Sequence, residues 1–240
     1  MKNYYLSIII PAYNEEKKIG RDIREAFNYL KKNKILGEVI VSTDGVTDDT
    51  NKIVRTLMNE FPDLILLTKK KKIGKGAAIK RGVFLAKGKY IMFADAGLCV
   101  PFKFIDSGIK KLEEGYDLAL GDRADKSALI KYRQPLYRRI GSKVFGLIIK
   151  YALGLPSHIK DTQCGFKIYK HDVAKRLFKD LKTPTMMFDL EHILRAKKYN
   201  YKIATFPIEW SNDPDTKFSP MSGTIKNFKE TYNIKFKLRL

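Results

Sequence analysis

Short β-branched runs alternate with longer stretches of helical apolar spacing over the first half of the chain. The strand-like runs cover 6–10, 38–42, 63–68, 89–94 and 117–121. The stretches in which apolar residues recur three and four positions apart, and which therefore predict helices, cover 15–32, 48–60, 76–87 and 102–114. This repeated alternation predicts the α/β class, with a mainly parallel central sheet flanked by helices.

The pattern changes at about residue 123, where a basic loop begins. After it we expect an apolar helix near 134–154, a strand near 164–169, a helix near 187–199, a strand near 202–209 and a polar loop over 211–220. The chain has 240 residues, 44% of them hydrophobic, and no internal repeat. That is enough to bury one core as a single domain.

The charge balance narrows the class of partner. Lys and Arg (47) exceed Asp and Glu (26), and the formal net charge of +21 favours an anionic partner: nucleic acid, an acidic membrane leaflet or a phosphorylated ligand. The basic run at 69–72 has no zinc-finger, RNP or helix-turn-helix signature beside it, so we expect no nucleic-acid partner. Cys99 and Cys164 form neither a disulfide framework nor a metal-ligand set, as is usual in the reducing cytoplasm.

Membrane contact is predicted at the surface of a bilayer. No signal-peptide pattern opens the sequence, and the longest apolar stretch, Val144–Leu155, is well short of the roughly 20 residues that span a bilayer. Basic residues flank that stretch, so it forms either an element lying among lipid headgroups or a buried core helix. Near the C-terminus, one apolar helical stripe with basic residues around it favours peripheral attachment to an anionic leaflet. The stripe comprises Ile225, Phe228, Tyr232, Phe236 and Leu240.

Polar turns mark the candidate ligand site. Each of the first two strands ends in a turn that leads into a helix, which is how an open parallel sheet presents side chains to a nucleotide. Asp44 is placed to accept a hydrogen bond from a uracil or guanine ring N–H, whereas Asp48 is either a helix cap or a ligand. The turn Gly74-Lys75-Gly76 allows close backbone approach, and its lysine can meet a phosphate. It matches neither the dinucleotide fingerprint nor the Walker A loop.

Together these motifs resemble one family. The run 7–16 (SIIIPAYNEE), Asp44-Gly45-x-x-Asp48, Lys75-Gly76 and the strand-end Asp95 resemble the nucleotide-sugar domain of inverting family 2 glycosyltransferases, which have the GT-A fold. The segment 161–167 (DTQCGFK), Phe188-Asp189-x-Glu191 and Trp210 resemble dolichyl-phosphate β-glucosyltransferases, with dolichyl-phosphate mannose synthases as near relatives. The similarity extends from Leu6 to about Pro220.

The resemblance implies a GT-A, Rossmann-like single domain and a division of labour within it. Residues 1–122 would bind the nucleotide sugar, 123–222 would bind the acceptor, and 223–240 would form the basic amphipathic helix. Pro11, Tyr13, Glu15 and Asp44 would line the nucleoside pocket, with Lys75 close to it.

The same resemblance assigns the reacting end of the site. Asp95 would face the ribose, the diphosphate and a Mg²⁺ or Mn²⁺ ion, and Arg123 would lie near the phosphates. The acceptor phosphate would be held by Arg123, Arg133, Arg138 and Arg139. The last three arginines also fit a solvated basic face. Asp161 and Asp189 are each a residual base or a structural carboxylate that caps or pairs.

One departure from the family pattern bears on the metal. Family members usually carry Asp-x-Asp after the fourth strand, but here Gly97 replaces the second Asp, and Thr43 replaces the first Asp of the usual Asp-Asp-Gly turn. Since Mg²⁺ prefers oxygen ligands, Asp95 alone would hold it loosely. Three readings are open: weak metal binding, metal-independent turnover supported by Lys and Arg, and a non-catalytic nucleotide-sugar-binding homologue.

The chemistry of the acceptor favours a phosphate. A sugar hydroxyl needs a general base before it attacks an anomeric carbon, whereas a phosphate monoester is already anionic near pH 7 because its second pKa is about 6. We expect a single inverting displacement in which a dolichyl or other polyprenyl phosphate attacks C1 of a nucleotide sugar, as a step toward protein glycosylation. UDP-glucose is the expected donor and GDP-mannose the alternative. The expected location is the cytoplasmic face of a membrane.

Overall fold

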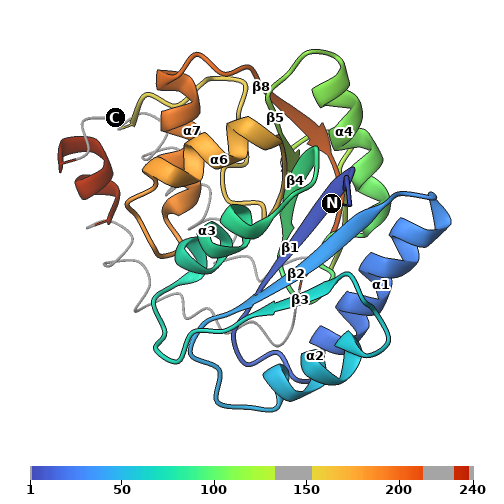
Figure 1. Cartoon of the computed structure of the whole chain (residues 1–240). Coiled ribbons are helices and arrows are strands. Elements are labelled where there is room, and N and C mark those ends of the chain that lie inside the picture. Colours follow the sequence, from blue (N-terminus) through green and yellow to red (C-terminus); the bar gives the residue numbers. More distant parts are fainter. Residues whose placement is uncertain (1, 133–152, 213–229, 238–240) are drawn as a thin grey trace.

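A seven-stranded sheet forms the centre of the computed structural model, which describes residues 2–132, 153–212 and 230–237 (Figure 1). Its strands are β1 (Leu6–Ala12), β2 (Gly37–Thr43), β3 (Leu64–Leu67), β4 (Tyr90–Ala94), β5 (Leu118–Asp122), β7 (Phe166–Lys170) and β8 (Ile203–Pro207). They lie in the order β3-β2-β1-β4-β7-β5-β8. All neighbouring pairs are parallel except the two that β7 makes. The mainly parallel α/β sheet predicted from the sequence is confirmed.

Helices cover both faces of this sheet. One layer contains α1 (Ile19–Lys32), α2 (Thr50–Met58), the 3₁₀ turn η1 (Phe102–Phe104) and α4 (Ile105–Glu113), and the other contains α3 (Lys75–Leu85), α6 (His171–Asp180) and α7 (Phe188–Lys198) (Figure 1). Side chains alternate along a strand, so Ile8 and Ile10 pack toward α1 and α4 while Ile9 packs toward α3. Both faces are buried, which explains why the strands are continuous apolar runs.

The antiparallel strand β7 determines where the site is built. A strand that runs against its neighbours begins at the edge where they end. Phe166, the first residue of β7, pairs with Ala94, the last residue of β4. The segment 161–165 before β7 therefore lies at the same edge as the residues that follow β4 and β5. Sequence periodicity placed this strand but gave no indication of its direction.

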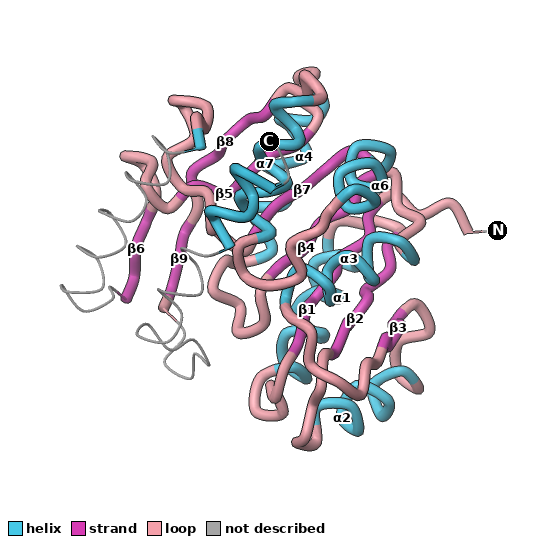
Figure 2. The backbone as a smooth tube through the Cα atoms, turned by 90° about the vertical axis from the view of Figure 1, so that its left-hand side faces the viewer, coloured by secondary structure: helices cyan, strands magenta, loops and turns pink. Residues whose placement is uncertain are grey.

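Two strands form a separate small sheet. β6 (Leu129–Tyr132) pairs in parallel with β9 (Glu209–Ser211), and Figure 2 shows this pair beside the seven-stranded sheet. The expectation of a loop from residue 123 is therefore wrong at 129–132. The predicted strand at 202–209 is divided in two, because Pro207 ends β8 and has no N–H for a further ladder bond.

The remaining expected elements have mixed outcomes. The expected helices and strands of residues 1–122 are all present, within a few residues of their predicted bounds. The helix α6 was not expected, although Val173, Ala174, Leu177 and Phe178 form its buried face at helical spacing. Nearly all of the predicted helix 134–154 and most of the loop 211–220 lie outside the described residues. No helix within the described part of the chain has both the length and the apolar character that a bilayer span requires.

The described C-terminal residues contain a short π-helix, η2 (Asn233–Lys237). Ile234 and Thr231 are buried, whereas Tyr232 and Phe236 are 59% and 57% exposed, with ring centroids 4.6 Å apart. These two aromatic residues belong to the predicted apolar stripe, and they face solvent. Ile225, Phe228 and Leu240 lie outside the described residues.

Candidate functional site

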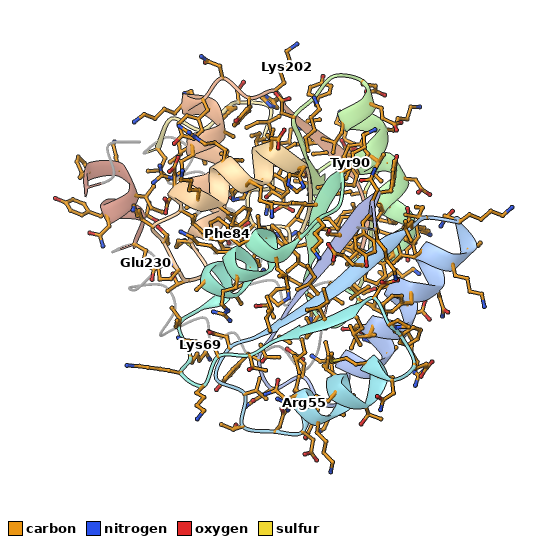
Figure 3. The ribbon with its side chains drawn as sticks, viewed as in Figure 1. Arg55, Lys69, Phe84, Tyr90, Lys202 and Glu230 are labelled. Atoms are coloured by element: carbon orange, nitrogen blue, oxygen red, sulfur yellow. The ribbon has the colours of Figure 1, made fainter. Side chains whose placement is uncertain are left out.

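Four of the predicted site residues follow strands at one edge of the sheet. Tyr13 follows β1, Asp44 follows β2, Asp95 follows β4 and Arg123 follows β5. In Figure 3, Lys69, just after β3, marks this edge, while Tyr90, the first residue of β4, lies at the opposite end. Ligands of open α/β sheets bind outside the carboxyl ends of the strands, so this is the candidate donor site.

The predicted nucleoside side of the site is bordered by the loop that follows β3. The Lys72 ammonium lies 3.3 Å from the centre of the Tyr13 ring, a cation–π contact. The Asp44 Oδ2 atom accepts hydrogen bonds from the backbone N–H groups of Ile73 (2.7 Å) and Gly74 (2.6 Å). The structure thus gives Asp44 a structural contact that the sequence did not predict. The recognition of a base ring by Asp44 stays a prediction. Oδ1 is the oxygen more available for it, because its contact with Arg81 Nη2 is long, at 3.5 Å.

The turn after β1 is fixed by the start of α2. The Glu15 N–H donates to Thr50 Oγ1 at 2.8 Å, and the Glu15 carboxylate pairs with Lys18 at 2.8 Å. The cap position of α2 is Asp49, one residue after the predicted Asp48, but Asp48 still accepts from the Thr50 N–H of the first turn at 3.0 Å. Pro11 is half-buried on β1, opposite Ser42 of β2. The pocket-lining roles of Pro11 and Glu15 stay predictions.

Asp95 and Lys75 form an ion pair at the end of β4. Lys75 Nζ lies 2.5 Å from Asp95 Oδ1, with the lysine side chain 14% and the aspartate side chain 36% exposed. Burial lowers the pKa of Lys75, but the carboxylates of Asp95 and Asp189 outweigh that effect and raise it, so the ammonium stays charged. The Asp95 backbone N–H donates to Gly165 O at 2.9 Å. A Cβ atom on Gly165 would fall 1.9 Å from Asp95 Oδ2, so any side chain at this position would displace this carboxylate.

Arg123 and Asp161 form a two-bond ion pair beside Asp95. Arg123 donates from Nε to Asp161 Oδ2 at 2.6 Å and from Nη2 to Oδ1 at 2.8 Å. The backbone N–H groups of Arg123 and Gln163 donate to the same carboxylate at 3.1 and 3.2 Å. Burial raises the pKa of Asp161, but the guanidinium outweighs it, and the pKa is lowered. An Asp161 with four donors and a low pKa is a poor general base, and the geometry favours its structural reading.

A further ion pair lies beneath these residues in the core. Lys167 Nζ is 2.5 Å from Asp189 Oδ1 and donates to Cys164 O at 2.6 Å, and both side chains are almost fully buried. Burial raises the pKa of Asp189, and burial raises the pKa of the Cys164 thiol to about 12. The pair holds the 161–165 segment from below. Asp189 is therefore removed from solvent, and its catalytic role stays a prediction.

The start of α3 is packed against the segment before α7. The N–H groups of Gly76 and Ala77 donate to Thr185 O and Pro184 O at 3.3 and 2.9 Å. A Cβ on Gly76 would lie 2.7 Å from Phe188 Cβ, so the close approach predicted for this glycine turn is made to protein. Glu191 holds the same segment, since its carboxylate accepts from the backbone N–H groups of Lys182 (2.8 Å) and Thr183 (2.6 Å).

The described residues do not form a complete metal site. No cluster of three or more His, Cys, Asp or Glu side chains able to hold a metal exists among them. Gly97 has φ +101°, a left-handed conformation that favours glycine, and its N–H donates to the buried Asp22 carboxylate. Asp95 as a Mg²⁺ or Mn²⁺ ligand therefore stays a prediction, and the carboxylate that would serve is paired with a lysine.

The described site differs from the predicted one in two ways: three predicted arginines are not described, and two lysines make contacts that were not predicted. Arg133, Arg138 and Arg139 lie outside the described residues, so their acceptor-phosphate roles stay predictions. Sequence reasoning missed the contacts of Lys72 and Lys167. A lysine in the apolar strand 166–170 is a recognisable signal for a buried partner, whereas nothing in the spacing pointed to Lys72.

Comparison with known proteins agrees with the fold and the motifs. Residues 7–178 match glycosyl transferase family 2. The chain belongs to that family and is a glycosyltransferase. Within it, the chain groups with the dolichyl-phosphate β-glucosyltransferases: it is 32% identical to the one from Dictyostelium discoideum, over 99% of this chain and 76% of the relative. It is 29% identical to the Homo sapiens protein of that name, over 97% of this chain and 75% of the relative.

The solved structures show the same fold. Glucosyl-3-phosphoglycerate synthase from Mycobacterium tuberculosis, crystallised with Mn²⁺, UDP and glucosyl-3-phosphoglycerate, aligns with a TM-score of 0.69 and 17% identity. The alignment covers 98% of this chain and 79% of that one. The GT-A fold expected from the resemblance is therefore confirmed.

Proposed function

We propose that this chain transfers glucose from UDP-glucose to a dolichyl or other polyprenyl phosphate and gives a β-linked lipid phosphosugar. The observation that supports a phosphate as the acceptor is that three predicted catalytic carboxylates are all engaged in ion pairs. Asp95, Asp161 and Asp189 are each paired with a cation, at 2.5, 2.6 and 2.5 Å. A hydroxyl acceptor would need a free base, but an anionic phosphate does not. The names of the relatives support glucose and dolichyl phosphate as the particular substrates.

Each part of the site has a role in this reaction. Tyr13 and Asp44 border the nucleoside, and Lys75 and Arg123 supply positive charge for the phosphates. The Arg123 guanidinium also lies 5.5 Å from the centre of the Trp210 ring, a cation–π contact. The lipid phosphate oxygen attacks C1 of the sugar while the bond from C1 to the UDP oxygen breaks. The protein positions the two anions and neutralises their charge, and no proton transfer is required.

The proposed location is the cytoplasmic face of a membrane, by peripheral contact. The exposed Tyr232 and Phe236 rings, with the exposed Lys235 between them, are suited to a headgroup region. The net charge of +21 adds attraction to anionic lipid. This arrangement would bring the site to an acceptor whose lipid tail remains in the bilayer.

Transfer of radiolabelled glucose from UDP-glucose to dolichyl phosphate in detergent tests the proposal. We expect a labelled lipid product that mild acid releases as glucose, and less product with labelled GDP-mannose. Arg123→Ala should lower the product at least tenfold, while Arg176→Ala, at a surface ion pair on α6, should leave it unchanged. Exclusive use of GDP-mannose, or absence of lipid product with both donors, would contradict the proposal.

A further inference from the structure

The carboxylate expected to hold a metal already holds a cation. Asp95 Oδ1 is 2.5 Å from the ammonium of Lys75. The backbone on both sides of this contact is fixed. The Asp95 backbone N–H donates a hydrogen bond to Gly165 O. The N–H groups of Gly76 and Ala77, just after Lys75, donate hydrogen bonds to backbone oxygens of the 184–185 segment. The backbone near each partner is therefore held by a neighbouring segment, so the Lys75–Asp95 pair is a fixed part of the carboxyl edge of the sheet.

The surroundings of Lys75 keep its charge. The ammonium lies 5.9 Å from the ring centres of Phe93 and Phe188, within the range of a cation–π attraction. Asp189 and Asp95 both act on it electrostatically. Its side chain is mostly buried but still 14% exposed at the carboxyl edge of the sheet. A phosphate that reaches Asp95 thus meets a charged lysine there.

A divalent ion at Asp95 would have to compete with this lysine. Like charges a few ångströms apart repel strongly in a partly buried site. The second carboxylate that would compensate is absent, because residue 97 is glycine and its N–H is bonded to Asp22. The described residues thus fit an ammonium at this position better than a metal.

We propose that Lys75, held by Asp95, is the resident cation of the donor site and takes the place of a divalent metal in neutralising the diphosphate. This inference rests on the proposed glucosyl transfer. In that step the electron pair of the broken bond at C1 stays on the β-phosphate of UDP, and the Lys75 ammonium faces the added negative charge. UDP binding and transfer then both proceed in EDTA.

Calorimetric titration with UDP in EDTA is the first test, because it needs no acceptor. We expect the wild-type chain to bind UDP and Lys75→Met to bind it at least tenfold more weakly. Lys75→Arg keeps the charge and should recover much of the affinity. Lys110→Met removes an exposed lysine from α4, in the layer on the other face of the sheet, and should bind as the wild type does. Thermal melting of each variant shows whether it is folded.

Mn²⁺ binding, followed by electron paramagnetic resonance without nucleotide, is the second test. Lys75→Met frees Asp95, so it should bind Mn²⁺ at least threefold more tightly than the wild type, and the added Asp95→Asn change should abolish the gain. Wild-type UDP binding that is lost in EDTA and restored by Mn²⁺ would overturn the inference, as would a folded Lys75→Met with unchanged UDP affinity. If UDP binding in EDTA depends on Lys75 but no lipid glucoside forms, the proposed function fails while the resident cation stands.

Discussion

The guanidinium of Arg123 donates to both carboxylate oxygens of Asp161, from Nε at 2.6 Å and from Nη2 at 2.8 Å. Lysine keeps the charge of arginine but cannot make this planar contact. We expect Arg123→Lys to lower the free energy of unfolding by about 1–3 kcal/mol, since the Asp161 carboxylate is buried and loses a partner. Lipid transfer should fall at least tenfold. Urea unfolding and steady-state kinetics measure the two effects.

An exposed arginine provides the matched control for this substitution. Arg176 Nε lies 3.4 Å from Asp180 Oδ2, and the arginine side chain is 57% exposed. Arg176→Lys should change the unfolding free energy by less than about 0.5 kcal/mol and leave transfer unchanged, as for most surface ion pairs. If Arg123→Lys and Arg176→Lys changed the unfolding free energy and the transfer rate equally, the Arg123–Asp161 pair would contribute no more than a surface ion pair.

The lowered pKa of Asp161 predicts a pH dependence of stability. The folded-state pKa lies below the ordinary 3.8, so the unfolded chain takes up this proton first. The stabilisation is therefore complete above the unfolded pKa and is lost as the pH falls toward the folded pKa. The difference in unfolding free energy between wild type and Asp161→Asn should stay constant from about pH 7 to about pH 5 and narrow as the pH falls from about 5 to about 3. Urea titrations across that range measure it, and a constant difference would count against the assignment.

Gly165 is expected to tolerate no side chain. A Cβ there would lie 1.9 Å from Asp95 Oδ2, so Gly165→Ala must displace that carboxylate. We expect a loss of about 1–3 kcal/mol in unfolding free energy and at least a tenfold loss of UDP affinity. Gly20→Ala, on the helix α1, is the control, because its Cβ would make only ordinary contacts, with Ile53 at 3.5 Å and Leu57 at 4.0 Å. It should leave stability equal or slightly higher. A fully stable Gly165→Ala with normal UDP affinity would contradict this prediction.

Gly97→Asp tests what the missing carboxylate does. The φ of +101° makes any side chain there unfavourable, so we expect a stability loss of about 1 kcal/mol. The new carboxylate should also raise the Mn²⁺ affinity at least threefold, because a second oxygen ligand then lies near Asp95. Thermal melting and Mn²⁺ titration measure the two effects. Unchanged Mn²⁺ affinity in a folded variant would show that residue 97 does not face the cation.

The exposed aromatic pair of the C-terminal helix predicts lipid binding. Replacing both Tyr232 and Phe236 by Ser should lower sedimentation with phosphatidylserine-containing liposomes at least threefold at low salt, since both rings would otherwise insert. Phe84→Ser is the control, because that ring is also about half exposed but belongs to α3. A wild-type chain that does not sediment with these liposomes would remove the membrane proposal altogether.

The sequence was most informative where a pattern and its physical cause are local. The strands of residues 1–122 are buried on both faces, so their apolar runs were predictable, and Tyr13, Asp44 and Asp95 were found because they directly follow those runs. The direction of β7 was not predictable, since the residue pattern of a five-residue strand carries no sign of its orientation.

Pairings between distant residues were also out of reach of sequence reasoning. Lys167 and Asp189 are 22 positions apart, and Arg123 and Asp161 are 38 apart. Each pair forms only because β7 enters the sheet beside β4 and β5. The sequence singled out Arg123, Asp161 and Asp189 but assigned no role to Lys167, and the partner of each follows from the sheet topology.

The position of β7 also has a consequence for how the chain is assembled during synthesis. Strands β1 to β4 can pair with one another as soon as they leave the ribosome, in the order β3-β2-β1-β4. β5 pairs only with β7 and β8, both of which are made later. Its buried residues Leu118 and Leu120 therefore wait without sheet partners until Phe166–Lys170 has been translated. We therefore expect a nascent chain stalled in that interval to expose an unpaired apolar strand and to be more prone to aggregation than the finished chain.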